Sequence, residues 1–167
     1  MNNEEVLEKL KDYHLKLGRA LEALQRGEEP ILEAFDDSFF EARQSENKCF
    51  SNVARMIENI LKVHCCLSSE ALSRNRNKWK HEFELHRDRV IDITMWRSKR
   101  REVNLIQYIE RNMPDIYENG INLVKKAAQK YPDLLGVTNA PEVCPWRLEE
   151  LMEEEIEDLQ LSNSNTK

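Results

Sequence analysis

The side chains with the greatest chemical potential in this sequence are four cysteines and four histidines. Cysteine and histidine can bind zinc together, or act as a nucleophile and its base. His64, Cys65 and Cys66 are consecutive, but neighbouring positions of a helix point about 100° apart and cannot close a tetrahedral site. His81 and His86 are five residues apart, whereas two histidines must be four apart to share a helix face. We therefore expect no metal site, and we interpret the cysteines as reduced, buried side chains.

The glycines indicate no nucleotide-binding loop. A phosphate-binding loop needs several glycines close together, whereas Gly18, Gly27, Gly120 and Gly136 are dispersed along the chain. The sequence also contains no arrangement typical of nucleophilic catalysis. We expect a protein that is not an enzyme and that uses no cofactor.

A basic segment could bind a negatively charged partner. Residues 74–101 contain ten Lys and Arg side chains against four Asp and Glu, a net charge of +6, with Trp79 and Trp96 interleaved. Cations could bind phosphates while the indoles stack on bases, so nucleic-acid binding is one interpretation. An acidic protein partner or the acidic end of this chain is the second interpretation, and a plain solvated helix face is the third. The candidate patch consists of Arg74, Arg76, Lys78, Lys80, Arg97, Lys99, Arg100 and Arg101.

The elements that carry these residues are predicted to be helices. The chain has 167 residues with only four glycines and five prolines, and residues 31–113 contain neither. Scarce breakers favour long helices over turn-rich sheets, so the predicted class is all-α. The segment 90–109 leaves helix and strand open, because its β-branched residues also alternate.

Two rows of apolar residues repeat with spacings of 3, 4, 3, 4 and 3, the pattern that keeps one helix face on a partner helix. His14 interrupts the first row and His64 the second. Joined by a reversing connection, two such seams predict an antiparallel helical hairpin within a bundle of residues 1–136. The seam residues are Leu7, Leu10, Leu17, Leu21 and Leu24 in the first row and Phe50, Val53, Ile57, Ile60 and Leu67 in the second.

Residues 137–167 are predicted to form a proline-containing extended connector, an acidic amphipathic helix from 145 to 161, and a frayed tail. Seven carboxylates lie between Arg147 and Leu161. Such a helix gains most by docking, either on the basic segment of its own chain or in the groove of another protein. Its candidate partner-binding residues are Trp146, Leu148, Leu151, Met152, Ile156, Leu159 and Leu161.

Four of these residues form a recognisable pattern. Met152, Ile156, Leu159 and Leu161, separated by three, two and one residues, look like a leucine-rich nuclear export signal. The resemblance implies capture in a receptor groove, with the chain extended at its end. The run "RSKRR" at 97–101 is similar to a short nuclear import signal.

The expected function is that of a non-enzymatic helical interaction subunit, an adaptor or scaffold of a larger assembly. Its partners would be other protein subunits or further copies of itself, with nucleic-acid binding as the alternative. We expect no membrane association, because the first residues are acidic and no long apolar run occurs. The expected location is intracellular, in the cytoplasm, the nucleus or both.

Overall fold

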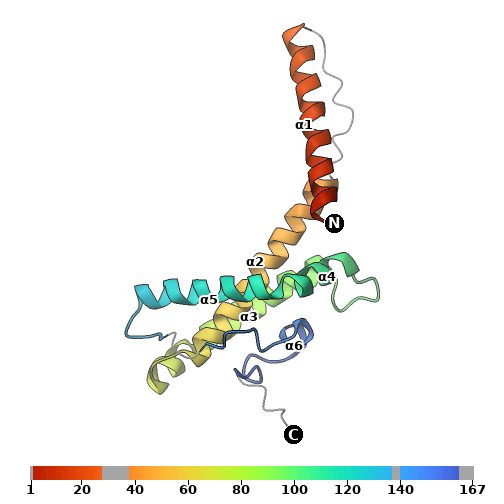
Figure 1. Ribbon diagram of the computed structural model, residues 1–167. Helices are drawn as coiled ribbons and strands as arrows, with labels where there is room; N and C mark the ends of the chain where they lie inside the picture. The colour runs from red at the N-terminus through yellow and green to blue at the C-terminus, as the bar shows by residue number, and fades with distance from the viewer. Residues whose placement is uncertain (1, 28–37, 137–139, 162–167) are drawn as a thin grey trace. The chain divides into compact units, whose positions relative to one another are not determined.

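In the computed structural model the chain is all-helical, as predicted (Figure 1). The structure describes residues 2–27, 38–136 and 140–161. Within these ranges there are six helices: α1 Asn3–Gln25, α2 Ser38–His64, α3 Ser69–Thr94, α4 Val103–Arg111, α5 Met113–Lys130 and α6 Leu148–Glu153. The predicted frayed end after Leu161 lies outside the described residues.

The chain divides into two units, Met1–Gln44 and Ser45–Lys167. We had expected a bundle of residues 1–136 followed by a separate appendage. The division falls within α2 instead, and the C-terminal residues belong to the second unit. The reason is that the C-terminal apolar side chains lie in the same hydrophobic core as those of α2 to α5.

Residues at each end of α1 define its length. The Asn2 side chain accepts a hydrogen bond from the Glu5 backbone N–H at 2.8 Å, and the Glu5 carboxylate accepts one from the Asn2 backbone at 3.0 Å. This reciprocal arrangement satisfies two N–H groups that the first helical turn leaves without partners. Gly27 ends the helix with a φ of +70°, a conformation that glycine adopts without steric cost.

The core of the second unit is built around α2. Val53, Ile57 and Ile60 of the second seam are 0% exposed, and residues of α3, α4 and α5 complete the same cluster. Helix α5 crosses α2 at Gly120 (Figure 1). A Cβ at position 120 would lie only 2.6 Å from Ile57 Cγ2, so the two helices approach this closely only because the residue is glycine.

One seam residue was placed wrongly by the sequence pattern. Helix α2 ends at His64, so Leu67 lies in the turn before α3 and its side chain is exposed. Two backbone hydrogen bonds hold this turn, from Leu67 N to Leu134 O and from Gly136 N to Cys65 O. The Ser68 hydroxyl then accepts from Ala71 N at 3.1 Å and begins α3. The Ser68 cap therefore starts α3 directly after this turn, and the helix runs through the polar residues that follow.

The segment 90–109 is helical at both ends. Helix α3 continues to Thr94 and ends at Met95, which has a left-handed φ of 49°. A loop then leads to Val103, where α4 begins, and Pro114 lies in the first turn of α5. A proline is tolerated there because the first N–H groups of a helix have no intrahelical acceptor.

A buried carboxylate on α2 is neutralised by neighbours on the same helix. Glu58 forms ion pairs with Arg55 and Lys62, each with an N to O distance of 2.7 Å. Burial raises the pKa of Glu58, but the hydrogen bonds and charges of Lys62 and Arg55 together outweigh it and lower the pKa below its ordinary value of 4.5. The ionised form is therefore favoured within the fold.

Candidate interaction surfaces

The first seam lies on an exposed face of α1. Its five leucines, at positions 7, 10, 17, 21 and 24, each expose between 46% and 57% of their surface, and His14 is also exposed. We call these six residues the α1 stripe. A 23-residue helix of this kind is only marginally stable without a packed face. The sequence predicted that this stripe pairs with the second seam. Such a pairing would be a contact between the two units, and it stays a prediction.

Most residues of the second seam are buried within their own unit. Val53, Ile57 and Ile60 are enclosed in the core of their own unit, and Phe50 packs against that core partly buried. Two rows with the same spacing thus have opposite exposures. Of these two rows, the α1 stripe is the one whose leucines are exposed.

The C-terminal segment does not present the surface that we assigned to a partner. Trp146, Leu148, Leu151, Met152, Ile156 and Leu159 are all buried in the core, and Leu161 packs against it partly buried. The predicted helix from 145 to 161 is also too long, because α6 ends at Glu153 and the chain then continues in an extended conformation and a turn. The export-like residues are therefore covered by the chain itself in this fold.

Backbone hydrogen bonds explain how a non-helical segment can be covered in this way. Arg87 Nη1 donates to the Glu154 carbonyl at 2.7 Å, and His64 Nε2 donates to the Leu159 carbonyl at 2.9 Å. The Trp146 indole N–H donates to the Gln160 carbonyl at 2.9 Å. Carbonyl groups buried without such donors would cost free energy, so these side chains make the docked conformation stable.

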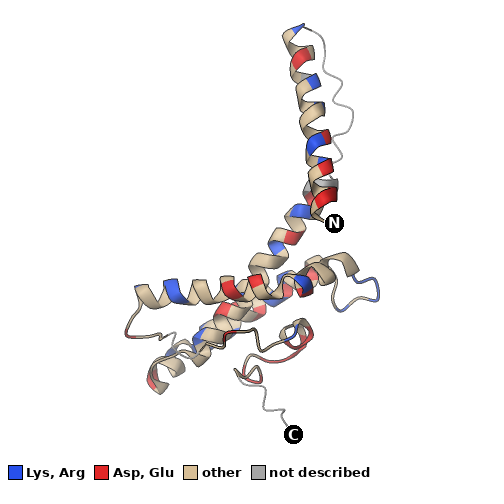
Figure 2. Ribbon diagram, viewed as in Figure 1, with Lys and Arg blue, Asp and Glu red and all other residues tan. Residues whose placement is uncertain are grey.

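The acidic charge of this segment faces the basic helix α3. Lys80 Nζ lies 3.2 Å from Glu155 and 3.4 Å from Glu157, and Arg76 lies 3.6 Å from Glu157. Figure 2 shows the Asp and Glu residues of the C-terminal segment and the Lys and Arg residues of the second unit. Part of the basic segment therefore binds the acidic end of its own chain. For that acidic segment, the sequence had left open docking on its own chain or on another protein.

The basic segment lacks the exposed indoles that base stacking requires. Trp79 is 4% exposed and Trp96 is 6% exposed. The Trp96 indole N–H donates to Glu153 at 3.3 Å, and the Arg101 guanidinium lies 5.0 Å from the Trp96 ring centroid. Arg97, Lys99 and Arg100 remain exposed in the loop before α4. The predicted patch is thus divided between α3, which contacts the tail, and this loop.

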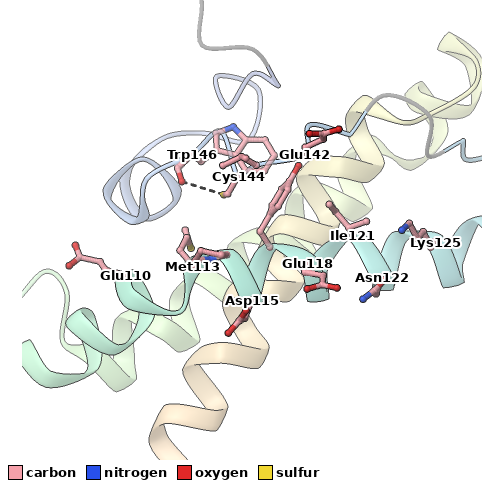
Figure 3. Close-up of a pocket in the computed structure, with 13 residues that line it drawn as sticks. Glu110, Met113, Asp115, Glu118, Ile121, Asn122, Lys125, Glu142, Cys144 and Trp146 are labelled. Atoms are coloured by element: carbon pink, nitrogen blue, oxygen red, sulfur yellow. Dashed lines mark hydrogen bonds between the residues drawn. The ribbon is translucent and has the colours of Figure 1, made fainter. Parts of the chain in front are cut away.

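A cleft of about 620 Å³ lies between α5 and the segment 142–146 (Figure 3). Tyr117 and Trp146 meet edge to face in its wall, with ring centroids 6.2 Å apart, and the Tyr117 hydroxyl donates to the Pro141 carbonyl at 2.8 Å. In Figure 3 the side chains of Asp115 and Glu118 point away from the segment 142–146. No motif predicted this cleft, because its residues come together from two distant parts of the chain.

Two residues of the cleft wall, Cys144 and Tyr117, are held in their neutral forms by burial. Burial raises the pKa of Cys144 to about 11. Burial, followed by the charges that Cys144 and Cys65 would carry, raises the pKa of Tyr117 to about 12. A neutral thiol is a poor nucleophile, so burial makes Cys144 unreactive at neutral pH.

Two of the four histidines, His64 and His86, connect different elements. Besides the bond from His64 to the tail, His86 Nδ1 on α3 lies 2.8 Å from Asn52 Oδ1 on α2. Burial and the charges of Arg89 and Arg55 lower the pKa of His86. Across the described ranges, no group of three or more His, Cys, Asp and Glu side chains is arranged to hold a metal ion. None of the helices in those ranges has the length and apolar character needed to cross a bilayer.

The structure thus defines an all-helical protein in which an acidic C-terminal segment completes the core and a leucine-rich helix is exposed. The chain belongs to the family described as domain of unknown function DUF29, whose model matches residues 40–157. Comparison with curated proteins and with solved structures gave no match. The matched range begins within α2 and ends at Glu157 in the C-terminal segment, and α1 lies before it.

Proposed function

We propose that this protein is a non-enzymatic helical interaction subunit that binds another protein chain through α1. The second unit would be the folded body, and α1 the element that joins it to an assembly. The single observation that carries the proposal is the α1 stripe: five leucines at coiled-coil spacing, each about half exposed. An intracellular location, in the cytoplasm or the nucleus, belongs to the same proposal.

The free energy available to such pairing is substantial. Covering the exposed half of one leucine side chain yields about 0.8 to 1.5 kcal/mol, so five leucines yield roughly 4 to 7.5 kcal/mol before ordering costs. Soluble proteins seldom leave contiguous apolar surface uncovered unless it binds something. A partner helix would also stabilise α1, which is otherwise marginal in water.

The other two candidate surfaces are less available, because the C-terminal segment is buried and part of the basic segment is paired with it. The tail, which the sequence offered as a partner-binding helix, is used to complete the core. The nucleic-acid alternative loses its stacking groups, because both tryptophans of the basic segment are buried. The α1 stripe is therefore the surface on which we place partner binding.

The experiment compares two leucines of α1 that are equally exposed. Leu17 lies on the stripe and is 51% exposed, whereas Leu15 lies off it and is 56% exposed. The tagged chain, its Leu17→Asp variant and its Leu15→Asp variant would each be expressed beside an untagged copy of the chain and used for affinity purification from cells. Bound proteins would be quantified by mass spectrometry, and the untagged copy by its mobility on a gel. We expect one set of proteins to be lost with Leu17→Asp and kept with Leu15→Asp. Equal recovery with all three proteins would refute a role for the stripe.

A further inference from the structure

We propose that the α1 stripe pairs with α1 of a second copy of this chain, and that the two helices run antiparallel. The inference rests on the proposed function and names its partner. It comes from the distribution of charge along α1, which the leucine spacing alone does not fix.

The two halves of α1 carry opposite charge. Residues 3–13 contain four Asp and Glu against two Lys, a net charge of −2. Residues 14–26 contain three Lys and Arg against one Glu, a net charge of +2. In an antiparallel pair the acidic half of each copy lies beside the basic half of the other. The two helix dipoles also point in opposite directions, which is favourable. A parallel pair would place like charges together along its whole length.

The leucines match in this orientation. Leu7 then packs opposite Leu24 of the second copy, and Leu10 opposite Leu21, because a positions face d positions in antiparallel pairs. His14 packs opposite Leu17 of the second copy. A parallel pair would instead bring two His14 side chains into one layer. The antiparallel register separates the two imidazoles and gives each an aliphatic neighbour.

The positions that flank the stripe place no like charges together. With the same register, Lys11 lies beside Gly18 of the second copy, and Glu4 beside Gln25. Gly18 has no atom within 4 Å of where a Cβ would be, so the partner's lysine stem has room. The remaining charges of α1 lie mostly on the outer face. There the acidic half of one copy attracts the basic half of the other over a longer distance, and salt partly screens this attraction.

The first test is the mass of the purified full-length chain in solution, measured by size-exclusion chromatography with light scattering over a range of concentrations. We expect a dimer that dissociates on dilution, because α1 supplies only about three heptads. Leu17→Asp should weaken dimerisation at least about 100-fold, since each dimer would bury two carboxylates. Leu15→Asp should leave it unchanged, and His14→Leu should strengthen it by completing the apolar row.

The second test determines orientation with engineered cysteines. In an antiparallel pair position 10 faces position 21, and the two positions 10 are about 16 Å apart, too far for a disulfide. Mild oxidation should therefore cross-link a mixture of Leu10→Cys and Leu21→Cys, and neither variant alone. Peptide mapping locates the bond, with the unmodified chain as the control for native thiols. Cross-linking of Leu10→Cys to itself would show a parallel pair and overturn the orientation.

These results also separate the inference from the proposed function. The chain could stay monomeric at every concentration while Leu17→Asp no longer recovers some other protein. That result would overturn dimerisation through α1 and leave partner binding through α1 intact. A monomer whose recovered proteins are the same in Leu17→Asp and Leu15→Asp would overturn both.

Discussion

Replacing Leu151 with alanine tests whether the C-terminal segment is part of the fold. Leu151 is on α6, is 0% exposed and belongs to the core cluster of the second unit. Truncating a leucine at such a site removes its transfer free energy and leaves a cavity, at a cost of about 2 to 5 kcal/mol. Whole domains are stable by only about 5 to 15 kcal/mol, so the effect should be large.

The assay is urea unfolding of the full-length chain followed by tryptophan fluorescence. Trp79, Trp96 and Trp146 are all buried in the second unit, so their signal reports the unfolding of that unit and not of α1. With a slope of about 2 kcal/mol per molar urea, the midpoint should fall by about 1 to 2.5 M.

The matched control is Glu149→Ala, at an exposed position on the same helix. It should change the free energy of unfolding by no more than about 0.5 kcal/mol. If Leu151→Ala moved the midpoint no further than Glu149→Ala, α6 would be an appendage and the assignment of the tail to the core would be wrong.

Three further outcomes follow from the same structure. The low pKa of Glu58 adds stability that is complete above its ordinary value of 4.5 and is lost as the pH falls through its folded value, so Glu58→Gln should flatten the acid side of a melting-temperature profile. Gly120→Ala should cost about 1 to 3 kcal/mol in urea unfolding, because its methyl group collides with α2, whereas Gly18→Ala should raise the helix content seen by circular dichroism. Burial raises the pKa of Cys49 to about 12, so iodoacetamide at pH 8 should alkylate the more exposed Cys66 first and leave Cys49 unmodified until the chain unfolds; early labelling of Cys49 by mass spectrometry would contradict its burial.

Local chemistry in the sequence was sufficient to predict that the chain is helical, but not where every helix begins and ends. The scarcity of glycine and proline indicated an all-helical chain, and the repeat of three and four residues identified α1 and most of α2. Gly27 lies just after the end of α1 and Pro114 lies in the first turn of α5, which are the positions that these residue types prefer. These signals act within one or two helical turns, so they do not depend on what lies across the fold.

Where each apolar face is buried was decided by the tertiary structure alone. The two seams have the same spacing, yet Ile57 is fully enclosed and Leu17 is half exposed. The acidic segment likewise offered an amphipathic pattern without naming its partner, and the chain covers Ile156 with its own core. Periodicity is a property of neighbouring residues and shows that a face must be covered. The surface that covers it comes from residues far away in the sequence, whose meeting depends on how the whole chain packs.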